Sequence, residues 1–203
     1  MIITTIALFS AFPYYYNPNI HNLGNIGIGG KIHATLAPVA RRMIDHISYN
    51  GVDIRKDIMS EYRDMKVLDM CCGIGDSTLK GATGIDTSKE MIDMAKFINR
   101  SNKFYKANAE TYIPNENFDV VSCMFALHEM PIAAQYRVVN NAIKIAKKEV
   151  ILVDISSDYT PKKIMLSGEP YLIDYLNNID NILKKFEKIE YIPKHVSIWK
   201  YKK

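Results

Sequence analysis

Short apolar runs alternate with helical segments through the middle of the chain, and this alternation constrains the fold more than any other feature. Phe118–Phe125 and Glu149–Ile155 are strongly apolar and rich in β-branched residues, which is typical of strands buried in the centre of a sheet. Ser88–Ile98 and Pro131–Ala146 have the apolar spacing of helices. Because right-handed crossovers place helices on both faces of a parallel sheet, this order predicts an α/β fold with three layers. Shorter strands are expected at Lys66–Met70, Ala82–Asp86 and Lys103–Lys106.

The remaining segments extend this core at both ends. After Pro161 we expect a helix around Tyr171–Phe186, and the closely spaced runs Lys188–Ile192 and Val196–Tyr201 predict an antiparallel hairpin. Residues 13–35, with several tyrosines, prolines and glycines, indicate a loop-rich cap. With 203 residues, the chain is expected to form one domain, on a prior of roughly 150 residues per domain.

The positive charge of the chain is concentrated at its C-terminal end. The formal net charge is +4, but residues 184–203 hold seven lysines and two glutamates, a local +5 that leaves about −1 for the rest. A nucleic-acid-binding face needs a basic stripe across its working surface. We therefore expect no nucleic-acid partner.

Cysteine usage and hydropathy indicate the compartment. The three cysteines fit neither a disulfide framework nor zinc spacing, so we expect no metal site and a reducing, cytoplasmic location. No stretch reaches the ~18 apolar residues that a membrane helix needs. Met1–Phe12 is apolar but lacks the basic start and the cleavage site of a signal peptide, which favours a packed helix, a substrate contact or at most a peripheral membrane contact.

Two glycine clusters could bind ligands, and their contexts differ. The cluster at residues 24–30 follows no predicted strand and has Asn25 and Ile32 where a phosphate-binding loop needs a glycine and a hydroxyl residue. It is expected to form a surface turn. Gly73 and Gly75 instead follow the strand Lys66–Met70, at the place where α/β sheets bind ligands.

The turn after this first strand also discriminates between ligand classes. A dinucleotide fingerprint needs a third glycine where this chain has Thr78, which disfavours a nicotinamide oxidoreductase. Asp69 lies inside the motif, where its carboxylate would repel a pyrophosphate. The same carboxylate can accept hydrogen bonds from loop amides or meet a cationic amino group.

The run from Val67 to Gly75, V-L-D-M-C-C-G-I-G, resembles motif I of class I S-adenosylmethionine-dependent methyltransferases. The resemblance continues at Asp86, at Asn108-Ala109-Glu110 and in Phe118–Pro131, and it covers residues 64–155 well and 186–201 weakly. It implies a Rossmann-like, mostly parallel sheet in the order 3-2-1-4-5-7-6 with an antiparallel seventh strand. It also implies S-adenosylmethionine as the cofactor, with Asp86 accepting both ribose hydroxyls. The implied cofactor-binding residues are Asp69, Cys71, Cys72, Gly73, Gly75, Asp86, Thr87, Asn108, Ala109, Met124 and Phe125.

The resemblance implies methyl transfer by in-line displacement to a small or lipid-like acceptor. His128 follows the fourth predicted strand, at the edge where ligands bind, so it is the candidate for orienting or deprotonating that acceptor. The apolar start of the chain and its tyrosines favour a hydrophobic or amphipathic acceptor. The alternative is a scaffold subunit that has the fold but methylates nothing. Candidate acceptor-binding residues are Tyr14, Tyr16, His21, His33, His128, Glu169 and Tyr171.

We thus expect a single methyltransferase domain with three regions. Residues 1–60 form an N-terminal cap or helical extension, 61–155 the cofactor-binding core, and 156–203 the acceptor-side loop, helix and terminal hairpin. Only 17 positions separate Asp69 from Asp86, so the helix after the glycine turn is expected to be shortened to Asp76–Lys80.

Overall fold

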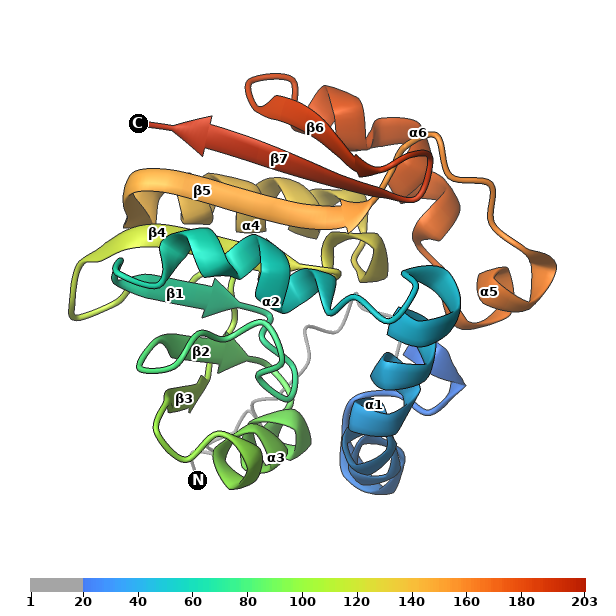
Figure 1. The fold of residues 1–203 in the computed structure, drawn as a ribbon, viewed down its shortest axis with the longest axis horizontal. Helices are drawn as coiled ribbons and strands as arrows, with labels where there is room; N and C mark the ends of the chain where they lie inside the picture. The colour runs from blue at the N-terminus through green and yellow to red at the C-terminus, as the bar shows by residue number, and fades with distance from the viewer. Residues whose placement is uncertain (1–19) are drawn as a thin grey trace, which may run out of the picture.

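Seven strands form one sheet in the order β3-β2-β1-β4-β5-β7-β6 in the computed structural model, which describes residues 20–203 (Figure 1). Neighbouring strands are parallel except β7, which runs antiparallel to both β5 and β6. This topology confirms the expected α/β fold and the terminal hairpin. The strands are β1 (Val67–Met70), β2 (Thr83–Asp86), β3 (Lys103–Lys106), β4 (Phe118–Met124), β5 (Ala146–Ile155), β6 (Glu187–Ile192) and β7 (Val196–Lys202).

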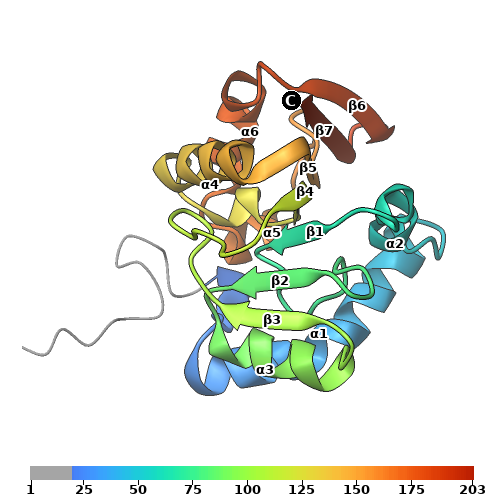
Figure 2. The same cartoon turned by 90° about the vertical axis from the view of Figure 1, so that its left-hand side faces the viewer.

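Helices cover both faces of the sheet and complete the three layers (Figure 2). Successive strand residues point to opposite faces, so Val121 packs in the cluster that includes α4 and α6, whereas Val120 packs with α2. A smaller cluster joins α3 to Phe104 of β3. The helices and 3-10 turns are η1 (Ile20–Asn22), α1 (Gly27–Ser48), α2 (Ile54–Met59), η2 (Ser60–Tyr62), α3 (Lys89–Ile98), η3 (Leu127–Glu129), α4 (Ile132–Ile145), α5 (Lys163–Gly168) and α6 (Leu172–Ile182).

The N-terminal glycine cluster lies at the start of a helix. α1 begins at Gly27, so the expected surface turn is wrong for residues 27–30, and the loop-rich cap ends there. The preceding chain folds back against the first turn of α1: a Cβ added to Gly29 would lie 1.9 Å from the Leu23 carbonyl oxygen. Glycine is therefore needed for close approach within a helix. α1 lies beyond the carboxyl ends of β1 and β2, beside α3 (Figure 1).

The described chain has no helix between β1 and β2, so the shortened helix expected at Asp76–Lys80 is wrong. Ser77 and Thr78 donate their hydroxyl hydrogens to Asp69 Oδ2 over 2.8 and 2.6 Å, which holds the segment against the end of β1. The Asn102 side chain then bonds to three backbone groups of the following turn. These ties fix an irregular crossover in place of a helical one.

Some element ends also differ from the expected ones. The helix expected to reach Phe186 ends at Ile182, because Leu183 and Phe186 turn into the core. α5 forms in a stretch that the sequence indicates as irregular. The two edges of the sheet are β3 and β6, and both present charged side chains to solvent.

Within residues 20–203, none of the helices combines the length and the apolar composition needed to cross a membrane.

Candidate functional site

The chain after β1 makes a tight turn with three left-handed residues. Cys71, Gly73 and Gly75 have φ angles of 56°, 53° and 82°. The two glycines serve different purposes. A Cβ added to Gly75 would lie 2.7 Å from the Phe104 ring, whereas one added to Gly73 would meet no atom within 4 Å. Gly73 lines a cavity, so the open space beside it is where a ligand can approach the backbone.

Two adjoining cavities open at the carboxyl ends of β1, β2 and β4. Their volumes are about 190 and 70 Å³. The larger one reaches α1 and α2, and the smaller one reaches the segment after β3. Open α/β sheets bind ligands at this edge. The residues that line both cavities are Asn25, Cys71, Asp86, Ala126 and Glu129.

Asp86 ends β2, and its side chain lines both cavities. The Gly73 N–H donates to Asp86 Oδ2 over 2.9 Å, and the Ser88 N–H donates to Oδ1 over 2.8 Å. Burial raises the pKa of Asp86 to about 6. Each carboxylate oxygen has a second lone pair. Asp86 can therefore accept two further hydrogen bonds from a ligand.

The structure brings together nine of the eleven residues expected around the cofactor; only Asp69 and Gly75 lie outside the two cavities. Gly75 lines a third cavity of about 530 Å³, which shares Arg41, Asp76 and Ser77 with the larger of the two. The nine residues are Cys71, Cys72, Gly73, Asp86, Thr87, Asn108, Ala109, Met124 and Phe125.

Asp69 lies beneath the turn and is fully buried. The Ser122 hydroxyl donates to its Oδ1 over 2.8 Å, in addition to the Ser77 and Thr78 hydroxyls on Oδ2. Burial raises the pKa of Asp69 against the lowering effect of these three donors. The Asp69 carboxylate thus accepts hydrogen bonds from hydroxyl groups, whereas we expected it to accept them from loop amides. Thr78, which replaces the third glycine of a dinucleotide motif, anchors the turn.

Acidic and histidine side chains form another wall of the larger cavity. His21 Nε2 lies 2.9 Å from Glu129 Oε1, and His21 Nδ1 lies 2.8 Å from Glu169 Oε1. The His33 ring packs edge-on against His21, with 4.8 Å between ring centroids. The fold therefore brings together three residues that were expected on the acceptor side, His21, His33 and Glu169. Glu129 was not predicted as a site residue, because no local sequence pattern marks this glutamate as one.

The charges of this cluster are fixed by its geometry. Burial opposes the cationic form of His21, but Glu129 and Glu169 outweigh it and raise the pKa of His21 to about 11. Burial alone would raise the pKa of Glu129, yet the neighbouring His21 lowers it below its usual value. Near neutral pH the cavity wall thus holds a histidinium and a glutamate carboxylate.

His128 lies behind this wall and does not line either cavity. Its Nδ1 is 2.5 Å from Asp154 Oδ1, and its Nε2 is 4.0 Å from Glu129 Oε1. Burial opposes the cationic form, but Asp154 raises the pKa of His128 to about 9. A histidine that is buried and protonated near neutral pH is a poor proton acceptor.

The other residues expected on the acceptor side are Tyr14, Tyr16 and Tyr171. Tyr14 and Tyr16 fall outside the described residues. Tyr171 is half-buried immediately before α6 and lines neither cavity.

Two arginines that line the larger cavity were also not predicted from the sequence. The Arg55 guanidinium lies 4.2 Å from the centre of the Phe125 ring, and burial lowers its pKa. Arg41 lies within 3.1 Å of carboxylate oxygens of Asp45, Asp53 and Asp76, so it ties α1 to the body. No sequence motif marks these residues, because they reach the cavity only through the packing of α1 and α2.

The three cysteines are free thiols around the turn. A hydrogen bond with Cys123 and burial both raise the pKa of Cys71 well above its usual value, and burial does the same for Cys72. A thiol with a raised pKa is a weak nucleophile. This agrees with the interpretation of these residues as small side chains that line the turn.

Comparisons with known proteins agree with this architecture. The model of a methyltransferase domain family matches residues 61–195. No curated protein matches the chain by sequence. Among solved structures, magnesium protoporphyrin IX methyltransferase of Synechocystis PCC 6803, with bound S-adenosylhomocysteine, is 15% identical with a TM-score of 0.55, covering 85% of this chain and 86% of the other.

Two further structures have similar folds. An N-methyltransferase of Bradyrhizobium japonicum WM9, in complex with S-adenosylhomocysteine, is 11% identical with a TM-score of 0.55, covering 83% of this chain and 98% of the other. A protein of Pyrococcus horikoshii OT3 is 14% identical with a TM-score of 0.59, covering 80% and 95%. At these identities the likeness concerns the fold, whereas the family match spans more than half of the chain. Because of that match, this chain belongs to the methyltransferase domain family, and its sequence resembles the class I branch of that family.

Proposed function

We propose that this protein transfers a methyl group from S-adenosylmethionine, the cofactor of its family, to a small-molecule or lipid-like acceptor. The observation that carries the proposal is the Asp86 carboxylate, which lines both cavities beside the Gly73 backbone. A carboxylate with free lone pairs at a cavity junction suits two neighbouring hydroxyl groups, such as those of a ribose.

The residues around Asp86 suit the other parts of this cofactor. In the smaller cavity, Asn108 and Ala109 would hold the adenine. In the larger cavity, the Arg55 guanidinium would pair with the carboxylate of the amino-acid part. Gly73 leaves room for the ligand, since a Cβ there would occupy open space beside the turn. The residues that line the two cavities therefore fit a nucleoside that carries an amino acid.

When bound, S-adenosylmethionine supplies an electrophilic methyl group on a sulfonium. The contribution of the protein is to hold the acceptor in line with that methyl group and to exclude water. Well-oriented reactants can recover roughly 7–11 kcal/mol of the barrier. Positioning is thus the main task of the residues that line the larger cavity.

Glu129 and His21 are the groups that would meet the acceptor. Glu129 lines both cavities and remains ionised, so it can accept a hydrogen bond from a hydroxyl or amino group of the acceptor. His21 holds this carboxylate in place from the same cavity. His128, bonded to Asp154, supports Glu129 from behind and acts as a positioning residue.

Small-molecule acceptors are also supported by a relative. The similar Synechocystis enzyme is a methyltransferase of magnesium protoporphyrin IX. The alternative of a scaffold that methylates nothing would require a damaged cofactor site. The convergence of nine expected residues on two cavities speaks against such damage.

Asp86→Ala tests the proposal through cofactor binding. Two hydrogen bonds to a charged acceptor are worth about 1.5 kcal/mol each, so the loss should weaken S-adenosylhomocysteine binding by about a hundredfold in titration calorimetry. Asp93→Ala, which removes an exposed carboxylate on α3, is the matched control and should bind like the original chain. Circular dichroism would verify that both variants are folded.

Equal affinity of Asp86→Ala and Asp93→Ala would overturn the assignment of the ribose site. Incubation with labelled S-adenosylmethionine and a metabolite or lipid extract then separates the two functions. Transferred label supports the enzyme, and cofactor binding without any transfer supports the scaffold.

A further inference from the structure

Helix α1 exposes its large aliphatic side chains to solvent. Ile28, Val39 and Ile47 are 80%, 60% and 75% exposed, and the residues that α1 buries against the body are Gly30, Ala34 and Asp45. A surface helix normally does the reverse, with an apolar stripe on the core and polar residues outside. The outer face of α1 therefore lacks a partner among the described residues.

Six exposed apolar side chains of α1 form one continuous stripe along the helix. They follow one another at spacings of 4, 4, 3, 4 and 4 positions, which at 3.6 residues per turn places all six within an arc of about 100° around the helix axis. α1 has 22 residues and spans about 33 Å at 1.5 Å per residue. We call this surface the outer stripe of α1; it consists of Ile28, Ile32, Leu36, Val39, Met43 and Ile47.

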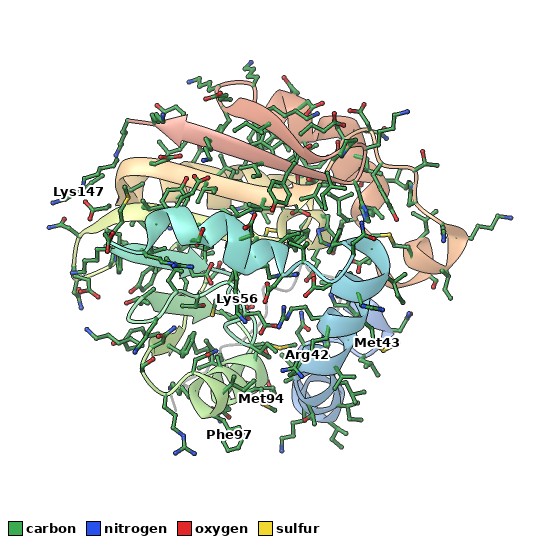
Figure 3. The ribbon with its side chains drawn as sticks, in the orientation of Figure 1. Arg42, Met43, Lys56, Met94, Phe97 and Lys147 are labelled. Carbon is green, nitrogen blue, oxygen red and sulfur yellow. The ribbon has the colours of Figure 1, made fainter. Side chains whose placement is uncertain are left out.

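Cations border the outer stripe. Lys31 and Arg42 lie along one side of it, and Figure 3 shows Arg42 on the side of α1 toward α2, with Met43 on the outer side. The acid of α1 is Asp45, which is buried and paired with Arg41. The accessible surface of the helix is thus apolar and cationic.

The cavity of about 530 Å³ opens beside this border, since Arg42 lines it together with the irregular crossover between β1 and β2. Asp76 is the acid among its described lining residues, and Arg41 already pairs with it. Arg42, Arg63 and Lys80 make no ion pair with described residues. The cations that line the cavity are Arg41, Arg42, Lys56, Arg63 and Lys80.

The sequence that leads into the helix is uncharged and largely apolar. Residues 1–30 contain no Asp, Glu, Lys or Arg, and three adjacent tyrosines stand at positions 14–16. Aromatic side chains with a polar tip suit the boundary between an apolar and an aqueous phase.

We propose that α1 docks with its outer stripe on an anionic lipid membrane, with headgroup phosphates at the cation-lined cavity. An amphipathic helix that lies in the membrane interface combines an apolar face with Lys and Arg beside it. A second copy of this chain is the poorer occupant. It would bring the same unpaired cations to the contact without acids to neutralise them, whereas an anionic bilayer supplies that charge.

Co-sedimentation of the full chain with lipid vesicles tests this proposal without any cofactor. We expect binding to vesicles of phosphatidylcholine mixed with phosphatidylglycerol and little binding to phosphatidylcholine alone. Replacing Ile28, Val39 and Met43 together by Gln should reduce the partition at least about tenfold, because it removes the apolar insertion. Ile113→Gln with Ile173→Gln, exposed apolar residues outside α1, is the matched control and should bind normally.

A charge series tests the cavity. Replacing Arg42, Arg63 and Lys80 by Gln should reduce binding about a hundredfold, since each cation near an anionic surface adds to the attraction. Lys184→Gln with Lys185→Gln, exposed lysines in the turn between α6 and β6, is the control. Thermal melts would verify that the variants are folded.

Four results would overturn the proposal. These are equal binding to both kinds of vesicle, an equal loss in the control variants, a dimer in analytical ultracentrifugation that the stripe variant abolishes, and pyrophosphate binding at the cavity without vesicle binding. Because no cofactor or methyl transfer is measured, failure here would leave the proposed methyltransferase function untouched.

Discussion

At the scale of single residues, Asp86 combines structural and ligand-binding roles. Its carboxylate accepts hydrogen bonds from the Gly73 N–H in the turn after β1 and from the Ser88 N–H after β2, so the same residue shapes the turn and presents lone pairs to the cavities. Burial raises its pKa to about 6, close to neutral pH. The negative charge of Asp86, on which the proposed ribose contact depends, is therefore lost by protonation in mildly acidic solution.

Cofactor affinity should accordingly depend on pH. Protonation of Asp86 removes an acceptor, so S-adenosylhomocysteine affinity should be constant above about pH 7 and fall about tenfold at about pH 5. Titration calorimetry across this range measures the effect. Asp86→Asn cannot titrate and should show weak binding without the decline. A decline of the same size in Asp86→Asn would assign the pH dependence to another group.

His21 should make the free energy of unfolding depend on pH above neutrality, whereas Asp86 acts below it. Its folded pKa of about 11 exceeds the ordinary value of 6.5, so the folded state holds the proton more tightly. The resulting stabilisation is complete below about pH 6.5 and is lost as the pH rises toward 11. In urea denaturation, His21→Gln should therefore lose much more stability relative to the original chain at about pH 6 than at about pH 10. His46→Gln, an exposed histidine of α1, should show no such difference, and equal losses for His21→Gln at both pH values would contradict the ion-pair assignment.

The residues of the candidate site were predictable where a strand end positions them. Gly73, Asp86 and Asn108 lie close in sequence to the ends of β1, β2 and β3, so topology alone brings them together. Arg55 and Glu129 could not be predicted, because tertiary packing of α2 and η3 brings them to the cavity. Asp69 lies in β1 beneath the turn, and three hydroxyl groups donate hydrogen bonds to its carboxylate, which the sequence could not reveal.

At the scale of secondary-structure elements, the crossover between β1 and β2 depends on side chains that hold irregular backbone. Next to it, Gly84 of β2 must lack a side chain, because a Cβ there would lie 2.7 Å from the Phe104 ring of β3 and 2.8 Å from Cys72 Sγ at the start of the crossover. Sequence periodicity cannot reveal such contacts, which explains why a short helix was expected here. The strands and the long helices were predictable because each combines a clear apolar pattern with burial on a sheet face.

Gly84→Ala tests this packing. Overpacking of this kind costs about 1–3 kcal/mol of the free energy of unfolding, which urea denaturation can measure. Adding Phe104→Leu should restore part of the loss, because the smaller side chain leaves room for the new methyl group. Unchanged stability of Gly84→Ala would show that β2 and β3 can separate at no cost.

At the scale of the whole molecule, the larger cavity connects parts of the chain that are far apart in sequence. Its walls come from α1, α2, the turn after β1 and the segment after β4. The β6–β7 hairpin contributes nothing to it within the described residues. A ligand in this cavity should therefore stabilise one side of the protein.

Hydrogen exchange with mass spectrometry can detect this asymmetry. Addition of S-adenosylhomocysteine should slow amide exchange in residues 33–41, 71–77 and 124–129, which line the larger cavity. Exchange in β6 and β7 should be unchanged, which provides an internal control. Protection limited to the sheet, with α1 unaffected, would place the ligand outside the larger cavity.

The charged edges of the sheet have a consequence for how copies of the protein behave at high concentration. Lys103 and Lys106 lie on β3, and Glu187, Lys188 and Glu190 lie on β6. Charged side chains on an edge strand oppose the addition of a strand from another copy. The protein can therefore present an apolar helix to its surroundings without offering a template for amyloid growth, so any self-association should be helical, reversible and free of fibrils.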